Sequence, residues 1–287
     1  MRYFDIHTHV ISVDTATYPL APLGGKQSVW SRERPVNIDQ LLAAMDEADV
    51  EKSVVVQAST AYSYDNRYLA DSLDAAGGDR LLGVCSVDFL APDAVDRLEY
   101  WICQRGFVGV RLFSTGSTMP DQGDWLDDSR CDDAWAWCEQ HSVPVCVQMQ
   151  STGIPQLERI LERFPLLTIV LDHAARPVLT GGPPYPQAAP VFALSRYERI
   201  FLKVTSNTFL RAEKEEGGVD GLLGALVSHF GANRIAWGTN FPATKGTMPE
   251  LVAYAERSLA QLNESDRQSI FADTARAIYS RLAEVTT

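Results

Sequence analysis

The stretch Tyr3-Phe4-Asp5-Ile6-His7-Thr8-His9 decides the fold prediction for this chain. It is a short apolar run that ends in two histidines. Because successive side chains of a strand point to opposite faces, His7 and His9 are expected to face the same side. Two imidazoles at the carboxyl end of a strand can hold a metal ion or bind the oxygen atoms of a substrate. A lone pair of this kind is also typical of a strand that merely ends in polar residues, so the rest of the chain decides.

Further apolar runs rich in β-branched residues follow, and an amphipathic stretch comes after each. Some are almost continuously hydrophobic, such as Val54-Val55-Val56. This pattern is typical of strands that are covered on both faces, as in a parallel sheet. The runs predicted as strands are Tyr3–His7, Ser53–Ala58, Leu81–Val87, Val108–Phe113, Val143–Met149, Leu167–Asp172, Ile200–Val204 and Arg234–Gly238.

The segments between these runs carry helix signals. Asn37 is expected to cap a helix with Gln40 at its third position, and Pro92 to stand at the first position of another. Predicted helices cover residues 37–48, 92–101, 154–164, 221–230, 249–262 and 265–282.

This alternation predicts an α/β fold, a (β/α)8 TIM barrel that forms one domain over residues 1–287. Long loops, at residues 10–36, 114–129 and 174–186, are expected after strands one, four and six and could act as lids. A doubly wound open sheet is the alternative. It is disfavoured because no GxGxxG or GxxxxGK[ST] motif opens the first helix.

The composition limits the kinds of partner. A net charge of −12 and a pI near 4.8 argue against binding to nucleic acid or to an anionic membrane. No apolar run reaches the ~20 residues that span a bilayer, and the first strand begins too early to leave room for a signal peptide. Among the five cysteines, which form no CxxC, Cys85 and Cys146 are expected to be buried thiols. We expect a cytoplasmic protein with a small-molecule substrate, and a homo-oligomer is possible.

Polar side chains end every predicted strand. In a barrel these ends meet on one face, where the catalytic sites of this fold lie. From the first long loop, Tyr18, Trp30, Arg32 and Arg34 could also reach a ligand. The strand-end residues expected around one cavity are His7, His9, Gln57, Asp88, Arg111, Gln148, Gln150, Asp172, His173, Thr205, Ser206, Asn207, Thr239 and Asn240.

The order of these motifs resembles the amidohydrolase superfamily. The resemblance rests on His7 and His9, on Leu171-Asp172-His173 of the sixth strand and on Trp237-Gly238-Thr239-Asn240-Phe241-Pro242 of the eighth. Within the superfamily the chain resembles the branch of 2-pyrone-4,6-dicarboxylate lactonase and related sugar and muconolactone lactonases. The resemblance implies a hydrolase that opens a lactone or related cyclic ester, either a sugar lactone or an intermediate of aromatic degradation. Activated water would attack the carbonyl group.

The resemblance also implies roles for single residues. His7 and His9 would bind a metal ion or the substrate, and Arg111 would hold a carboxylate or carbonyl oxygen. His173 would polarise the scissile carbonyl, and the acid at the strand-8 position would activate the water. The further residues predicted to bind substrate are Gln57, Gln148, Arg176 and Asn207.

The strand-8 position departs from the family pattern. It is an aspartate in the family's GTD[FYW]P motif and Asn240 here. A carboxamide does not accept a proton at neutral pH, so the general base is missing. The chain is then an inactive Asp-to-Asn variant, an enzyme that uses another base, or a catalytically silent binding protein.

The strand-5 position is the second departure. Metal-dependent members place a histidine where this chain has Gln148. Two histidines and an amide make a poor zinc site, so we expect no cofactor. The alternative is one divalent ion such as zinc, held by His7, His9 and an aspartate in place of Asn240. A metal-dependent decarboxylase of the same superfamily is the rival activity. Since strand 7 ends in uncharged residues, we also expect a substrate less anionic than a pyrone dicarboxylate.

Overall fold

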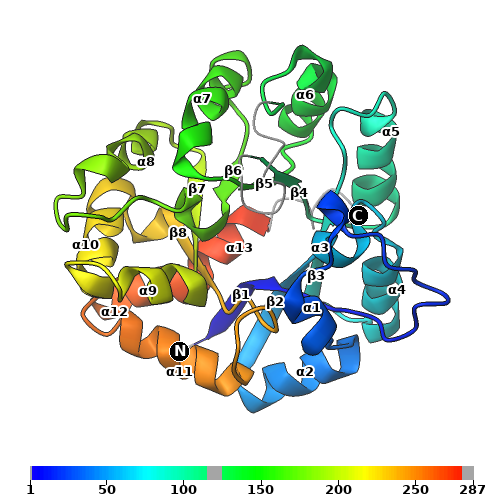
Figure 1. The fold of residues 1–287 in the computed structure, drawn as a ribbon, viewed down its shortest axis with the longest axis horizontal. Coiled ribbons are helices and arrows are strands. Elements are labelled where there is room, and N and C mark those ends of the chain that lie inside the picture. The colour runs from blue at the N-terminus through cyan, green and yellow to red at the C-terminus, as the bar shows by residue number, and fades with distance from the viewer. Residues whose placement is uncertain (1, 115–124, 280–287) are drawn as a thin grey trace.

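The strands form one parallel sheet whose order follows the sequence from β1 to β8, with the helices outside it (Figure 1). The computed structural model describes residues 2–114 and 125–279. All eight predicted strands are confirmed, and so is the (β/α)8 barrel. The strands are β1 Tyr3–Thr8, β2 Val50–Val56, β3 Leu81–Ser86, β4 Gly109–Phe113, β5 Val145–Gln148, β6 Ile169–Leu171, β7 Ile200–Thr205 and β8 Ile235–Gly238.

The last strand returns to the first. Thr8 forms a parallel bridge with Phe241, whose carbonyl accepts the backbone N–H of His9 at 2.9 Å. The buried carboxylate of Asp5 accepts the backbone N–H groups of His7 at 2.9 Å and Thr239 at 3.0 Å, and the Thr239 hydroxyl. Burial raises the pKa of Asp5 to about 6. This seam places the two histidines of β1 beside the segment that carries Asn240.

The helices agree with the prediction in part. Asn37 and Gln40 form the expected capping box. Pro92 lies in the turn before its helix, which begins at Ala94, and the predicted helix 265–282 is broken by a π-helical turn over Ser269–Asp273. The helices labelled α1, α3, α4, α6, α8 and α9 were not predicted. The helices are α1 Val29–Glu33, α2 Ile38–Glu47, α3 Ser59–Tyr62, α4 Arg67–Ala76, α5 Ala94–Glu99, α6 Asp132–Gln140, α7 Ile154–Arg163, α8 Ala189–Ala193, α9 Ser206–Ala212, α10 Gly218–Phe230, α11 Met248–Ser258, α12 Glu264–Gln268 and α13 Thr274–Tyr279.

Apolar side chains fill the barrel at its amino-terminal end. Phe4, Ile6 and Val54 pack there against Ile278 and Tyr279 of α13, which lies behind the ring of strands in Figure 1. A second cluster lies between the strands and the outer helices. The polar strand ends are therefore left to the opposite, carboxyl-terminal end. In the part of the chain that the structure describes, no helix is both long and apolar enough to cross a bilayer.

Candidate active site

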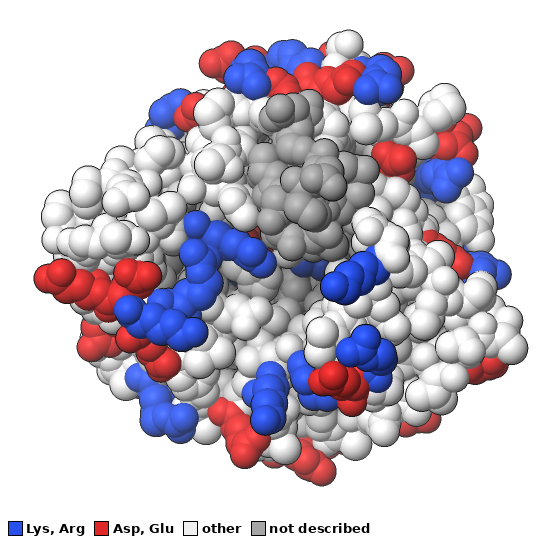
Figure 2. Space-filling model, viewed as in Figure 1, with Lys and Arg blue, Asp and Glu red and all other residues white. Residues whose placement is uncertain are grey.

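A cavity of about 530 Å³ opens at the carboxyl ends of the strands. In Figure 2 it corresponds to the hollow at the centre of the face, around which basic side chains gather. Nine residues were predicted to act in catalysis or in binding. Seven of these line the cavity, and they are His9, Arg111, Gln148, His173, Arg176, Asn207 and Asn240. The first long loop adds Lys26 and Trp30 to the lining. The structure thus brings together residues from six strand ends that lie far apart in the sequence.

Gln57 is a correction to the predicted set. Its side-chain amide donates to the carbonyl of Asp65 at 2.6 Å and reaches that of Ser63 at 3.5 Å. The side chain is buried against this turn and is not part of the described cavity lining. Gln57 therefore holds the turn between α3 and α4, and its position does not support a contact with substrate.

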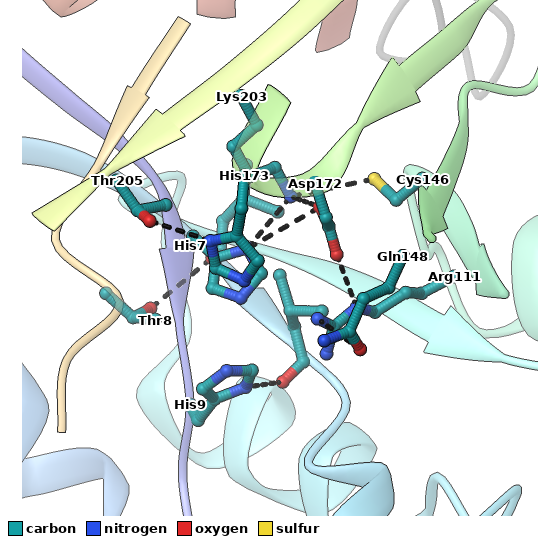
Figure 3. Close-up of polar contacts among 12 residues, drawn as sticks. His7, Thr8, His9, Arg111, Cys146, Gln148, Asp172, His173, Lys203 and Thr205 are labelled. Carbon is teal, nitrogen blue, oxygen red and sulfur yellow. Dashed lines mark hydrogen bonds and ion pairs between the residues drawn. The ribbon is translucent and has the colours of Figure 1, made fainter. Parts of the chain in front are cut away.

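Beneath the cavity lies a buried cluster of charges (Figure 3). Asp172 accepts the Nε–H of Arg111 at 2.7 Å, and its other oxygen lies 2.9 Å from Lys203 Nζ. Burial alone would raise the pKa of Asp172, but Lys203 and Arg111 together hold it well below its ordinary value. Arg111 also donates to Gln148 at 3.3 Å. One carboxylate thus fixes two cations, and Arg111 reaches the cavity already oriented.

The sequence prediction missed Lys203. Its Nζ lies 3.0 Å from His7 Nδ1 and 3.8 Å from Cys146 Sγ, and the side chain has no exposed surface. The signal that could have revealed it is a lysine inside the apolar run Ile200–Val204 of a barrel strand. Long basic side chains are almost never fully buried unless they are paired.

We predict that Lys203→Met destabilises the fold by about 3 kcal/mol, because removing one partner of a buried ion pair leaves an uncompensated charge. Urea unfolding followed by circular dichroism measures this loss. Lys52→Met is the matched control, since Lys52 pairs with the exposed Asp79 at 2.7 Å and exposed pairs contribute ~1 kcal/mol or less. Equal losses in the two variants would contradict a structural role for the buried cluster.

Three neutral imidazoles face one another above this cluster. The ring of His7 lies 4.9 Å from that of His9 and 5.4 Å from that of His173. Burial lowers the pKa of His9 to about 3 and that of His173 to about 3, and it lowers the pKa of His7 well below its ordinary value. Near neutral pH all three rings are therefore uncharged hydrogen-bonding groups.

Hydrogen bonds fix what two of these rings offer to a ligand. His9 Nδ1 lies 2.7 Å from the carbonyl oxygen of Val56. A carbonyl only accepts, so Nδ1 carries the proton and Nε2 is an acceptor. His173 Nδ1 lies 2.7 Å from Thr205 Oγ1. When the Thr205 hydroxyl donates in that contact, the proton of His173 is on Nε2, where it can be donated into the cavity.

The backbone that carries these side chains is strained. His173, Ala174, Ala175 and Arg176 are four consecutive residues with φ between 49° and 55°. Left-handed backbone costs roughly 1–2 kcal/mol per non-glycine residue. Because both ends of this turn, His173 and Arg176, line the cavity, the strain coincides with the placement of two candidate functional groups.

Asn240 also has a left-handed backbone, with φ of 60°. Its side-chain Nδ2 donates to Thr244 Oγ1 at 3.0 Å, and its backbone carbonyl accepts the backbone N–H of Thr244 at 2.8 Å. The amide is thus oriented within a closed turn at the cavity. Asparagine and aspartate tolerate this backbone better than other non-glycine residues, so either one fits at this position.

The residues of the first long loop differ in position. Trp30 lines the cavity and stacks on His9, and Arg34 donates to carbonyls of the segment after Asn240. Tyr18 donates to Asp71 instead, at 2.8 Å, and Arg32 is exposed next to Glu33. Trp30 is therefore the residue of these four that contributes to the described cavity lining.

The described lining of the cavity is cationic. It contains Lys26, Arg111 and Arg176 and no aspartate or glutamate. Burial lowers the pKa of Arg176, and the charges of Arg211 and Arg111 lower it further. Arg111 and Arg176 were predicted from the sequence, whereas Lys26 of the first long loop was not.

Comparisons with known proteins find relatives that are similar in sequence or in fold. The chain is 27% identical over 214 residues to L-fucono-1,5-lactonase of Burkholderia ambifaria. The aligned region covers 74% of this chain and 70% of the lactonase. Its fold matches a probable 2-pyrone-4,6-dicarboxylic acid hydrolase of Acinetobacter baumannii, with a TM-score of 0.75, 18% identity, and coverage of 98% and 100% of the two chains. It also matches an amidohydrolase of Burkholderia multivorans solved with bound zinc, with a TM-score of 0.74, 21% identity, and coverage of 98% and 99%.

The zinc in that last structure contradicts our expectation that no cofactor takes part. The described residues of this chain do not make a complete ligand set by themselves, since no three His, Cys, Asp or Glu side chains among them are grouped to hold a metal ion. The ammonium of Lys203 also lies 3.0 Å from His7 Nδ1, which places a positive charge beside one candidate ligand. We therefore assign no chemical step to a metal ion.

The family assignment rests on nearly the whole length of the chain. The family model described as Amidohydrolase matches residues 4–281, from the first strand to the end of the barrel. The match and the lactonase relative confirm the resemblance that the order of the motifs indicated. The chain belongs to the amidohydrolase family and is an enzyme of that family.

Proposed function

We propose that this enzyme hydrolyses a lactone or related cyclic ester that carries a carboxylate. The observation that carries the proposal is a cavity in which a neutral imidazole, His173, lies beside the cations Arg111 and Arg176. A neutral donor suits a carbonyl oxygen, and a cation such as Arg176 suits a carboxylate. The relationship to L-fucono-1,5-lactonase supports lactone opening. A sugar lactone and an intermediate of aromatic degradation both fall within this class.

In the proposed reaction, water adds to the lactone carbonyl and the ring C–O bond breaks, which gives a hydroxy acid. The Nε2–H of His173 donates to the carbonyl oxygen as it becomes an oxyanion. The amide of Asn240 orients the attacking water, but it cannot take the proton. Proton removal from water is therefore the step that this chain performs poorly as sequenced.

The substrate's carboxylate would be held by Arg176, whose pKa is lowered by burial and by the charge of Arg211. Two neighbouring arginines at a half-buried site repel each other, and a bound anion relieves that repulsion. The other arginine of the cavity lining, Arg111, is already paired with Asp172 at 2.7 Å. Arg176 is thus the cation best placed to select an anionic substrate.

The decarboxylase alternative is less well supported. Its metal-dependent members require a histidine ligand on strand 5, and that position is Gln148, whose Oε1 accepts from Arg111 at 3.3 Å. Hydrolysis needs no ligand at this position, so it is the activity we propose.

A panel of lactones tests the proposal. We expect a lactone with a carboxylate, such as a glucarolactone or muconolactone, to react with a kcat/KM at least about tenfold above an uncharged gluconolactone, because one hydrogen bond to a charged group contributes ~1.5–3 kcal/mol. Acid release followed with a pH indicator measures turnover. Arg176→Met is expected to remove the preference. Carbon dioxide release from aromatic acids, without lactone opening, would overturn the proposal.

A further inference from the structure

One side of the short helix α1 contacts His9 in the cavity lining. The ring of Trp30 stacks on the imidazole of His9, with 5.1 Å between ring centres and 26° between ring planes. The imidazole also forms the 2.7 Å hydrogen bond from Nδ1 to the carbonyl of Val56, and its ring meets that of His7 edge-on at 4.9 Å. The hydrogen bond fixes one edge of the ring, and the stack restrains its rotation about that edge. Together they set the direction of His9 Nε2.

The residue that caps this helix, Arg34, contacts the segment that carries Asn240. Arg34 Nε donates to the carbonyl of Pro242 at 3.1 Å, and its Nη2 donates to that of Ala243 at 3.0 Å. These carbonyls belong to the turn that is closed by the hydrogen bonds between Asn240 and Thr244. Arg34 therefore holds the turn in which the Asn240 amide is oriented.

Trp30 and Arg34 are joined within one helical turn. The backbone N–H of Arg34, the residue that caps the carboxyl end of α1, donates to the carbonyl of Trp30 at 2.9 Å. A shift of either contact thus moves the other.

We propose that α1 is a brace in which Trp30 and Arg34 act as positioning residues, fixing the imidazole of His9 and the amide of Asn240 relative to each other. The proposal rests on the lactone hydrolysis proposed above. It assigns no contact with the reacting atoms to either residue. The brace keeps the His9 imidazole, which follows β1, and the Asn240 amide, which follows β8, at a constant separation. Constant separation matters because a misplacement of about 1 Å can cost up to ~10²-fold in rate.

The competing explanation is that Trp30 only fills a small apolar cluster with Ile11, Ala58 and Tyr62. That explanation predicts a loss of stability from any smaller side chain and no effect on the groups of the site. It gives no reason for the donors of Arg34 to point at the carbonyls that follow Asn240.

Histidine NMR tests the brace without any substrate. With ¹⁵N-labelled histidine, His9 should show one neutral form with a protonated Nδ1. We expect Trp30→Leu to move the chemical shifts of the two His9 ring nitrogens toward the average of the two tautomers. Trp30→Phe should restore these shifts. Arg34→Met should instead shift the side-chain amide signals of Asn240. Arg32→Met is the matched control from the same helix, with a side chain that is 61% exposed, and should change neither.

Kinetics on the best lactone complete the test, in the Asn240→Asp background. Trp30→Leu and Arg34→Met are each expected to lower kcat about tenfold with little change in KM, which is the result of lost alignment rather than lost binding. Trp30→Phe and Arg34→Lys should recover most of it. Unchanged His9 and Asn240 signals with a lower melting temperature would overturn the brace, and so would a rise in KM alone. If no lactone reacts in any form, the proposed function fails, while the NMR result still decides the brace.

Discussion

Replacing Asn240 by aspartate is expected to raise lactone hydrolysis by about 10²–10⁴-fold, the usual contribution of a positioned general base. The amide already lines the cavity within a closed turn, and its left-handed φ of 60° suits aspartate as well as asparagine. The substitution therefore adds a proton acceptor without moving the backbone. The gain should appear in kcat, because the base acts on water in the transition state and not in substrate binding.

Two controls separate the base from other consequences of a new charge. Asn207→Asp adds a carboxylate elsewhere in the lining of the same cavity and should give no comparable rise. Zinc content is measured in both the unsubstituted chain and the Asn240→Asp variant, since a carboxylate there could complete a ligand set with His7 and His9. Turnover of the unsubstituted chain that already equals that of Asn240→Asp would show that another group activates the water.

The fold could be predicted because its signal is repeated. Each strand is an apolar run such as Val54-Val55-Val56, buried on both faces, and each carries the same information about a parallel sheet. The helix α2 was equally clear, because Asn37 and Gln40 satisfy each other's backbone groups at its start. Boundaries were less certain where a proline can stand either in a turn or in the first turn of a helix, as Pro92 shows.

The site was predicted only as far as strand ends identify it. Barrel topology brings such residues to one face, which is why His9, Arg111 and Asn240 were found. Lys203 was not, since its position inside an apolar run does not show that Asp172, directly after the neighbouring strand β6, lies 2.9 Å away. Gln57 was misassigned for the opposite reason: it stands at a strand end, but its amide satisfies the carbonyl of Asp65. Partners of buried polar groups depend on side-chain direction, which a pattern does not give.

The second large effect is expected from His173. In the Asn240→Asp background, His173→Asn should lower kcat by roughly 10²–10³-fold, because removing one donor to a developing oxyanion costs about 2.7–4 kcal/mol. His173 lines the cavity and has a φ of 53°. Asparagine is among the residues that best tolerate this backbone, so the strained turn to Arg176 should persist. Only the imidazole is then lost.

Thermal unfolding distinguishes a catalytic from a structural histidine. His229 stacks on Phe192 with 4.6 Å between ring centres, away from the described cavity lining, so His229→Asn should lower the melting temperature and leave turnover of the folded protein unchanged. His173→Asn should instead lower turnover and leave the melting temperature unchanged. If His173→Asn instead lowers stability while the folded fraction keeps near-normal turnover, the ring serves the buried hydrogen bond to Thr205 at 2.7 Å and not the oxyanion. The donor to the carbonyl oxygen would then have to come from the cationic side of the cavity, where Arg176 is the nearest candidate along the chain.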